Sequence, residues 1–296
     1  MRTKRTRGGI AFDAANYAAL ALLGAATLYP FWNLLAISLN ESMDTLRGGI
    51  TLFPRKFTLD NYTLIFQNRR LFSAVGLSVA RTLVGTAAAL AATMMVAYAL
   101  SRKEFVLRKA LNTVLVVSMY VNGGLIPYYL LIKQLGLTNT FLVYIVPGLL
   151  GAFHVMIMRS FFDELPAGLI ESAKLDGAGE FQTLLRVVAP ISLPVIATIA
   201  LFVSVGHWNA WLDNYLFNTD EKLTLLQYEL MKILMQSTEQ IGAGATNTVD
   251  ADLMRMTTPQ SIRATMTIVA TVPILLVYPF MQNYFIKGMT LGAVKE

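Results

Sequence analysis

The sequence has no cysteine and only two histidines, His154 and His207, among its 296 residues. The missing cysteine excludes disulfides, thiolate metal sites and a cysteine nucleophile. Charged residues are also scarce: they make up 14% of the chain, against 55% hydrophobic residues, whereas a soluble domain has roughly 25% charged residues. A soluble core could not bury this excess of apolar residues, so the composition predicts an integral membrane protein.

Motifs that would give the chain its own chemistry are missing as well. No G-x-x-x-x-G-K-[ST] loop occurs in the sequence, so the chain is not expected to hydrolyse ATP by itself. No cluster of His, Asp, Glu or Cys resembles a catalytic or metal site, and we predict no catalytic residue, metal or cofactor in this chain. The pI is near 9.5, but the basic residues gather beside apolar runs, so nucleic-acid binding is not expected.

The apolar runs predict an all-α fold with six transmembrane helices. The first run follows a basic start and is longer than the core of a signal peptide, which has about 7–15 residues, so we expect an uncleaved span. A run of about 20 apolar residues is long enough to cross a bilayer. The predicted spans are residues 17–39, a second that begins between 71 and 82 and ends at 100, and then 110–132, 141–161, 191–211 and 263–285.

These spans divide the chain into a basic tail at 1–16, a separate first helix, a five-helix core at 71–285 and a tail at 286–296. An even number of spans places both termini on one side of the membrane. The basic N-terminal tail and the basic run at 102–109 place that side in the cytoplasm, because Lys and Arg are enriched in cytoplasmic loops. The longest cytoplasmic segment is then the loop at 163–190.

This loop and the start of the next span predict an elbow of two short helices joined at a glycine. Pro166 suits the first turn of a helix, where its missing N–H costs nothing. Gly177 stands where a helix ends best on a residue that tolerates the left-handed conformation. A second helix is expected over 180–188 and should stop before Pro190. Small side chains on such a short exposed helix allow it to sit in a groove of another protein.

The elbow resembles the EAA loop of bacterial ABC importer permeases, in which Glu-Ala-Ala is followed by three residues, Gly, nine residues and Ile-x-Leu-Pro. Glu171, Ala173 and Gly177 match this pattern. Ser172 is a conservative departure, and Ala189 stands where the pattern has Leu. The resemblance assigns ATPase coupling to Glu171, Ser172, Ala173, Asp176, Gly177 and Pro190.

Other segments resemble the carbohydrate branch of this family, in particular the second permease of maltose-type importers. They are PRKFTLDNY at 54–62, AYALSRKEF at 97–105 and NYFIKGMTLGAVKE at 283–296. The segment GGLIPYYLLIKQLGLTNT at 123–140 resembles permeases of complex-oligosaccharide importers, of the lipo-oligosaccharide and polyuronide types. The resemblance covers nearly the whole chain. It implies an oligosaccharide as the solute, with an acidic oligosaccharide as one option.

The resemblance also implies the fold of a type I importer and a set of partners in the bacterial inner membrane. A second related permease would complete the translocation path. Two ABC ATPase subunits, which bind ATP and Mg, would dock on the elbows, and an extracytoplasmic solute-binding protein would deliver the sugar. The loop at 241–256 would reach into the binding protein, or it is a simple surface loop.

Sugar sites combine aromatic faces with a few polar groups, and two clusters have this composition. Tyr120 and Asn122 lie in the predicted third span, and Trp208, Asn209 and Trp211 lie at the outer end of the fifth. An aromatic belt at the membrane interface is the alternative explanation for the tryptophans. His207 is expected to be a packing residue of the helix bundle.

The main alternative function is that of a secondary, ion-coupled transporter, and a membrane enzyme is a third. Asp and Glu are absent from the middle of every predicted span, and embedded carboxylates are typical of proton or sodium coupling. An enzyme would need a catalytic cluster that the sequence lacks. We therefore expect a non-catalytic permease subunit.

Overall fold

The computed structural model describes residues 7–67, 69–239 and 258–293, and the secondary structure of these ranges is helical apart from one isolated bridge between Asn40 and Phe57. The chain forms two compact units. The first unit comprises residues 1–68 and 232–272, and the second comprises residues 69–231 and 273–296. The loop predicted at 241–256 lies outside the described residues.

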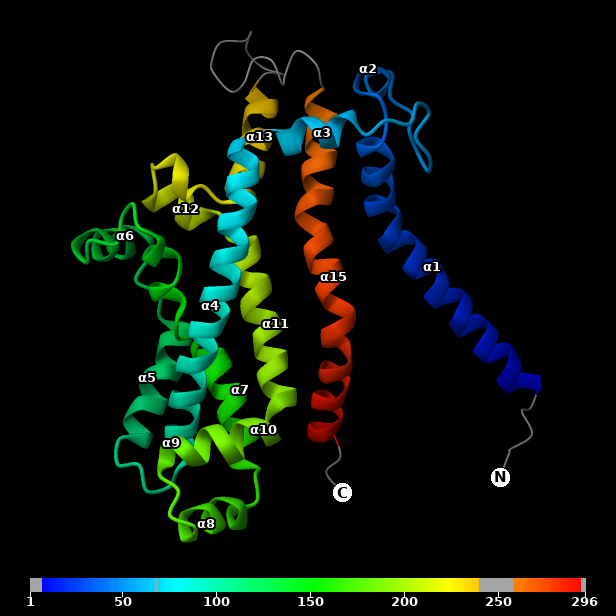
Figure 1. Cartoon of the computed structure of the whole chain (residues 1–296). Coiled ribbons are helices and arrows are strands. Elements are labelled where there is room, and N and C mark those ends of the chain that lie inside the picture. Colours follow the sequence, from blue (N-terminus) through cyan, green and yellow to red (C-terminus); the bar gives the residue numbers. More distant parts are fainter. Residues whose placement is uncertain (1–6, 68, 240–257, 294–296) are drawn as a thin grey trace. The chain divides into compact units, whose positions relative to one another are not determined.

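The first unit begins with α1 (Arg7–Ser38), a long apolar helix, and continues with α2 (Ser42–Thr45) and α3 (Asp60–Gln67) (Figure 1). Helix α1 starts at Arg7, so the described part of the basic tail predicted at 1–16 is helical. The division of the chain at residue 16 remains a prediction. Near its end, α1 packs against α15 (Pro259–Ala293) through the apolar residues Ala36 and Ile37, which share a buried cluster with Ala264.

A buried polar cluster organises the connection between α1 and α3. The amide of Asn40 donates to the carboxylate of Asp44 (3.1 Å), and Arg55 Nε lies 2.9 Å from the same carboxylate. Asn61 Nδ2 donates to the carbonyls of Ser38 and Asn40, both at 2.9 Å. The hydrogen bond from Asn40 and the Arg55 guanidinium lower the pKa of Asp44. Together with backbone bonds from Glu41 N to the carbonyl of Lys56 and from Thr58 N to that of Leu39, these side-chain bonds hold the connection in place.

The second unit is built around α4, which runs without a proline from Arg69 to Ser101. Helices α7 and α11 pack along it. Small or short side chains recur on the packed face of α4 about every four residues, at Ser78, Gly85, Ala89, Thr93 and Ala97, and this spacing puts them on one face. A Cβ on Gly85 would lie 2.6 Å from Nε2 of His207. This small-residue face therefore serves packing inside the unit.

The other elements of the second unit are short or bent. They are α5 (Arg108–Tyr120), α6 (Leu125–Gln134), η1 (Phe141–Tyr144), η2 (Val146–Gly148), α7 (Ala152–Asp163), α8 (Ala167–Leu175), α9 (Glu180–Thr183), the π-helical η3 (Leu184–Val188), α10 (Ala189–Ile191), α11 (Leu193–Asn209), α12 (Leu212–Phe217) and η4 (Glu221–Leu223). Helix α13 (Leu226–Glu239) follows and extends into the first unit.

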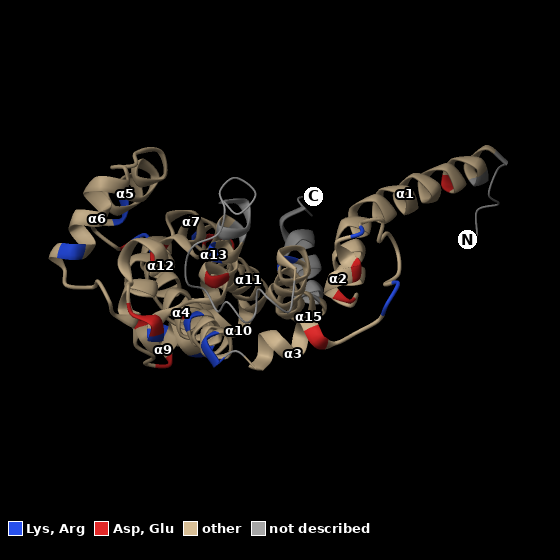
Figure 2. Ribbon diagram, turned by 90° about the horizontal axis from the view of Figure 1, so that it is seen from above, with Lys and Arg blue, Asp and Glu red and all other residues tan. Residues whose placement is uncertain are grey.

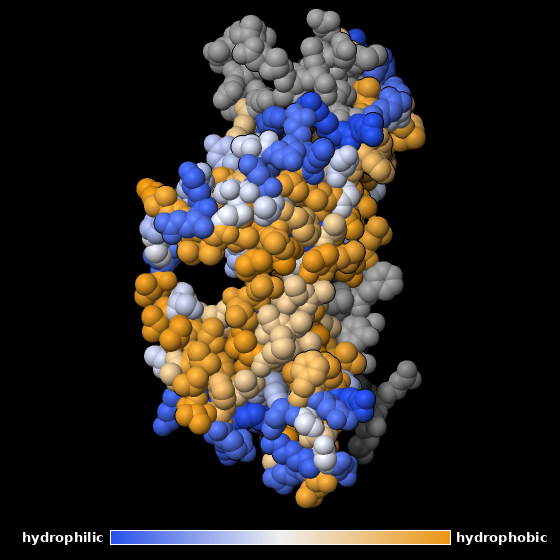
Figure 3. Space-filling model, turned by 60° about the vertical axis from the view of Figure 1, so that its left-hand side comes forward, coloured by the Kyte–Doolittle hydropathy of each residue, from blue (hydrophilic) through white to orange (hydrophobic). Residues whose placement is uncertain are grey.

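Three helices in the described part of the chain are long and apolar enough to cross a membrane: Ala11–Ser38, Arg69–Ser101 and Pro259–Val277. Two bent pairs raise the number to five if each pair is one span. These are η1–η2 with α7, bent by 48°, and α9–α10 with α11, bent by 87°. Charged side chains are sparse along the long helices (Figure 2), and apolar side chains gather between more hydrophilic ends (Figure 3). Six crossings remain a prediction.

The third predicted span, 110–132, is not one helix. Helix α5 ends at Tyr120, Val121 is extended, and Gly124 has a φ of +87° before α6 begins. The 13 residues of α5 rise about 20 Å, less than the roughly 30 Å of a bilayer core. The prediction missed this break because the run is hydrophobic on both sides of it. The break is caused by the Asn-Gly-Gly sequence, in which the side-chain oxygen of Asn122 accepts a hydrogen bond from Gly124 N (2.9 Å).

Candidate functional site

The elbow forms where the sequence predicts it. Helix α8 ends in a Schellman arrangement, in which Gly177 N donates to the carbonyl of Lys174 and Ala178 N to that of Ala173, both at 3.0 Å. This ending requires a left-handed residue after the helix, and Gly177 has a φ of +81°. The structure thus confirms the conformational role predicted for Gly177.

Both prolines of the elbow sit differently from the prediction. Pro166 precedes α8 as its cap residue and is not in its first turn. Pro190 does not end the second helix, which passes through a π-helical turn, where Ala189 N donates to the carbonyl of Leu184, and continues to Ile191. The chain turns sharply only at Ser192. A π turn has already broken the regular α pattern there, and we attribute the tolerance of Pro190 to it.

One face of α8 is buried in its own unit and the other is exposed. Ile170 and Ala173 are buried, so Ala173 contributes to seating the helix and is not available to a partner. Glu171, Ser172 and Asp176 are exposed, and Leu175 is 88% exposed. Helix α8 therefore presents a mixed polar and apolar face to its surroundings.

A carboxylate joins the two arms of the elbow. Lys174 Nζ lies 2.8 Å from Glu180 Oε1, and this contact raises the pKa of Lys174. The hydroxyl of Tyr98, at the end of α4, donates to the other oxygen of the same carboxylate (2.6 Å). Sequence reasoning missed Glu180, because its role depends on Tyr98, which is 82 positions away.

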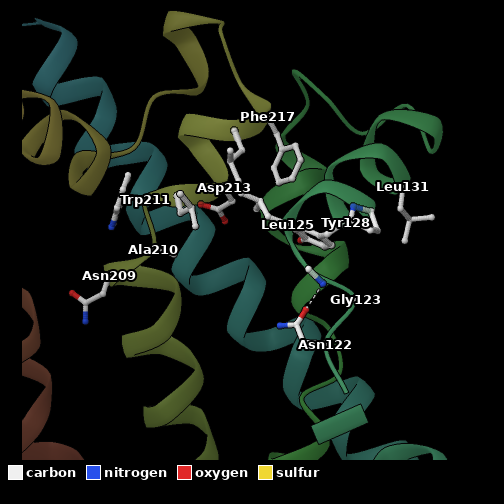
Figure 4. A pocket seen from close by; sticks show the side chains of 14 residues that line it. Asn122, Gly123, Leu125, Tyr128, Leu131, Asn209, Ala210, Trp211, Asp213 and Phe217 are labelled. Carbon is white, nitrogen blue, oxygen red and sulfur yellow. Dashed lines mark hydrogen bonds between the residues drawn. The ribbon is translucent and has the colours of Figure 1, made fainter. Parts of the chain in front are cut away.

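A second candidate site is a cavity of about 890 Å³ near the other end of α4. Figure 4 shows Asn122, Tyr128 and Phe217 on one side and Asn209, Trp211 and Asp213 on the other. The two clusters singled out in the sequence therefore meet in space. The lining residues are Asn122, Gly123, Gly124, Leu125, Pro127, Tyr128, Leu131, Asn209, Ala210, Trp211, Leu212, Asp213, Leu216 and Phe217.

Two of the predicted residues do not line this cavity. Tyr120 is 84% exposed at the end of α5. Trp208 is 6% exposed and belongs to the packed face of α11. Because consecutive helical residues point about 100° apart, Trp208 and Asn209 face different surroundings. Tyr120 and Trp208 thus lie outside this cavity, and their contact with sugar remains a prediction.

A buried ion pair supports the wall of the cavity. Arg81 of α4 is 4% exposed and forms a two-pronged salt bridge with Asp213. Its guanidinium also lies over the ring of Tyr144, 4.8 Å from the centroid. Asp213 lines the cavity, so a carboxylate that follows the fifth span does face it. The sequence signal that could have found this pair is the single cation inside the apolar run of α4.

Among the described residues, no group of three or more His, Cys, Asp or Glu side chains could hold a metal ion.

Comparison with known proteins identifies the family. Residues 86–291 match the family model of the binding-protein-dependent transport system inner membrane component. This is more than half of the chain. The protein belongs to this family. Its members are multi-pass proteins of the inner membrane, and the predicted permease identity and helical fold are confirmed. An ion-coupled carrier and a membrane enzyme are thereby set aside.

The relatives of this permease span its full length. It is 38% identical to Protein LplC of Bacillus subtilis over 98% of this chain and 97% of the relative. It is 34% identical to the polygalacturonan/rhamnogalacturonan transport system permease protein YtcP of the same organism, over 96% of this chain and 98% of the relative. These likenesses confirm the carbohydrate branch that the sequence motifs indicate.

A solved structure shows the same fold. One chain of a bacterial ABC transporter involved in the import of the acidic polysaccharide alginate aligns with a TM-score of 0.83 and 24% identity. The alignment covers 95% of this permease and 99% of that chain.

Proposed function

We propose that this permease is one of two related permease subunits of an ATP-driven importer, and that it couples ATP hydrolysis on cytoplasmic partner subunits to the passage of an oligosaccharide. The observation that carries the proposal is the exposed helix α8, which Gly177 holds in a fixed ending. Glu171, Ser172 and Asp176 would contact the ATPase. Both termini and the elbow would lie in the cytoplasm, and an extracytoplasmic binding protein would deliver the solute.

The separation of the two sites supports a mechanical role. Tyr98 at the elbow and Arg81 at the cavity wall lie on the same helix, 17 residues apart by their numbers, which is about 26 Å along an α-helix. The sequence contains no phosphate-binding loop of its own. A movement that the ATPase subunits impose on the elbow would therefore reach the cavity through shifts of packed helices, one of the ways in which coupled sites communicate in proteins.

The cavity and the relatives support an oligosaccharide as the solute. Trp211 and Tyr128 offer aromatic faces, and Asn122 and Asn209 offer amides, the combination that small-molecule sites use for orientation and specificity. Two relatives carry sugar polymers in their names: YtcP is a polygalacturonan/rhamnogalacturonan permease, and AraQ of Bacillus subtilis, 26% identical over 93% of this chain, is an arabinooligosaccharide permease. An acidic sugar fits as well, because Arg81 neutralises the one carboxylate of the lining.

The purified permease alone is expected to show no ATPase activity. Together with its partner permease and ATPase, it should hydrolyse ATP at a rate that rises when the loaded binding protein is added. Oligosaccharides should stimulate ATP hydrolysis by the assembled transporter, and the corresponding monosaccharides should not. Phosphate release in proteoliposomes measures both effects. Hydrolysis by the isolated chain would contradict the proposal, and stimulation by monosaccharides alone would contradict the solute class.

Replacing Trp211 with alanine is expected to lower the maximal rate of sugar transport about three- to tenfold, the effect of removing one aromatic contact. The half-saturating sugar concentration should change little, because the binding protein captures the sugar. Tyr215→Ala is the matched control: Tyr215 lies beside Trp211, with ring centroids 6.4 Å apart, but does not line the cavity. Equal losses in the two variants would mean that the cavity is not on the sugar path.

A further inference from the structure

One carboxylate holds three elements together at the elbow. Glu180, the first residue of α9, accepts a hydrogen bond from Tyr98 of α4 through Oε2 (2.6 Å) and contacts Lys174 of α8 through Oε1 (2.8 Å). Tyr98 is buried, and Arg102 lies over its ring, 4.9 Å from the centroid. The phenol is therefore held in place, and a hydrogen bond to a carboxylate is among the stronger ones in proteins.

The far part of the same helix is attached to the cavity wall. Arg81 pairs with Asp213, and the backbone N–H of Leu226 donates to Ser78 Oγ (2.9 Å). Between these attachments α4 contains no proline, whereas α1 and α15 each contain at least one. Kinks in helices occur mostly at proline. Helix α4 is thus one continuous, proline-free helix from the elbow to the wall of the cavity.

We propose that α4 transmits the movement of the elbow to the cavity wall, and that Tyr98 and Glu180 are the positioning residues that attach it to the coupling helix. This inference rests on the proposed function. When α8 moves with an ATPase subunit, the Glu180 carboxylate pulls the inner end of α4, and Arg81 carries that displacement to the segment 209–213 that lines the cavity.

Apolar packing is the rival means of transmission. Ile170 of α8 and Leu184 and Val188 of η3 belong to the same buried cluster as Ala97 and Leu100 of α4. If this packing alone carried the movement, the hydrogen bond would be dispensable. Removing only the hydroxyl of Tyr98 distinguishes transmission by the hydrogen bond from transmission by apolar packing, because the ring and its apolar neighbours stay in place. The freed carboxylate is 57% exposed and gains water, so the variant should fold normally.

The test is Tyr98→Phe in the complete transporter, reconstituted with binding protein in proteoliposomes. The number of sugar molecules imported per ATP hydrolysed should fall about tenfold, the lower end of what one hydrogen bond to a charged group carries. Co-purification of the ATPase and the unfolding temperature should not change. Tyr17→Phe loses the same hydroxyl at an exposed position outside both candidate sites and should match the parent.

A second variant shows whether the two residues act through one bond. In a Glu180→Ala background, Tyr98→Phe should cause no further fall in the sugar-to-ATP ratio. If the two substitutions lowered the sugar-to-ATP ratio independently, so that their effects multiplied in the double variant, the proposal would be overturned. An unchanged sugar-to-ATP ratio in Tyr98→Phe would overturn it too. If ATP hydrolysis by the parent complex did not respond to binding protein and sugar, the proposed function itself would be refuted. Failure of the proposed function can therefore be told apart from failure of the inference about Tyr98 and Glu180.

Discussion

The Asp213→Ala variant is expected to be less stable than the parent by about 3 kcal/mol, the lower end of what breaking a buried ion pair costs. Truncation leaves the guanidinium of Arg81, which is 4% exposed, without a countercharge in an apolar surrounding. The carbonyl of Ala210, 3.4 Å from Arg81 Nη1, replaces little of the lost attraction. The measurement is the unfolding temperature of the purified permease complex in detergent, together with its abundance in membranes.

A second ion pair of α4 provides the matched control. Arg70 lies 3.2 Å from Glu221, and both side chains are more than 60% exposed. Glu221→Ala should therefore change the unfolding temperature far less than Asp213→Ala, since exposed pairs contribute little. Replacing both buried partners, in Arg81→Met with Asp213→Leu, should restore most of the stability, because no unpaired charge remains. Equal effects at Asp213 and Glu221 would show that the buried pair has no special role.

The Gly177→Ala variant is expected to lower transport about tenfold, while membrane insertion and total abundance stay at parental levels. A β-carbon at a left-handed position costs about 1–2 kcal/mol, and Gly177 has a φ of +81°. The strain would unwind the end of α8 and turn its exposed face away from the ATPase. Gly177→Val should be worse, because a β-branched residue tolerates this conformation even less.

Gly179→Ala controls for this prediction. Gly179 lies two positions away and has a φ of −70°, and an added Cβ at either glycine meets no atom within 4 Å. The two substitutions thus differ in backbone strain and not in crowding. Transport, ATPase stimulation and co-purification of the ATPase should be parental in Gly179→Ala and reduced in Gly177→Ala. Parental transport in both would show that the elbow is only a connector.

The elbow shows how far local patterns reach. Gly177 and the position of the two short helices follow from residues close together in the chain, because caps and helix endings are formed by neighbours. The course of the chain at Pro190 does not follow from them. The helix continues through this proline because a π turn precedes it, and that turn is part of how Leu184 and Val188 pack into the core of the unit.

The cavity shows the opposite case. The aromatic and amide residues of two separate segments were identifiable by composition, but which of them share a cavity was not. Asn122 lies in a break between helices that hydrophobicity does not reveal, and Trp208 and Trp211 separate because the chain leaves α11 at Asn209. The charge of the wall depends on Arg81 and Asp213, which are 132 positions apart.

The sequence alone determined that this protein is helical and lies in a membrane, that it lacks an ATP-binding loop, and that it has a glycine-ended elbow of the permease type. These properties depend on composition, on the length of apolar runs and on contacts between near neighbours. Only the tertiary structure decided that the third run is broken and that α4 is tied to Glu180 at one end and to Asp213 nearer the other. Hydrogen bonds and ion pairs between distant segments form only when packing brings their atoms within about 3 Å, and no local pattern encodes that distance.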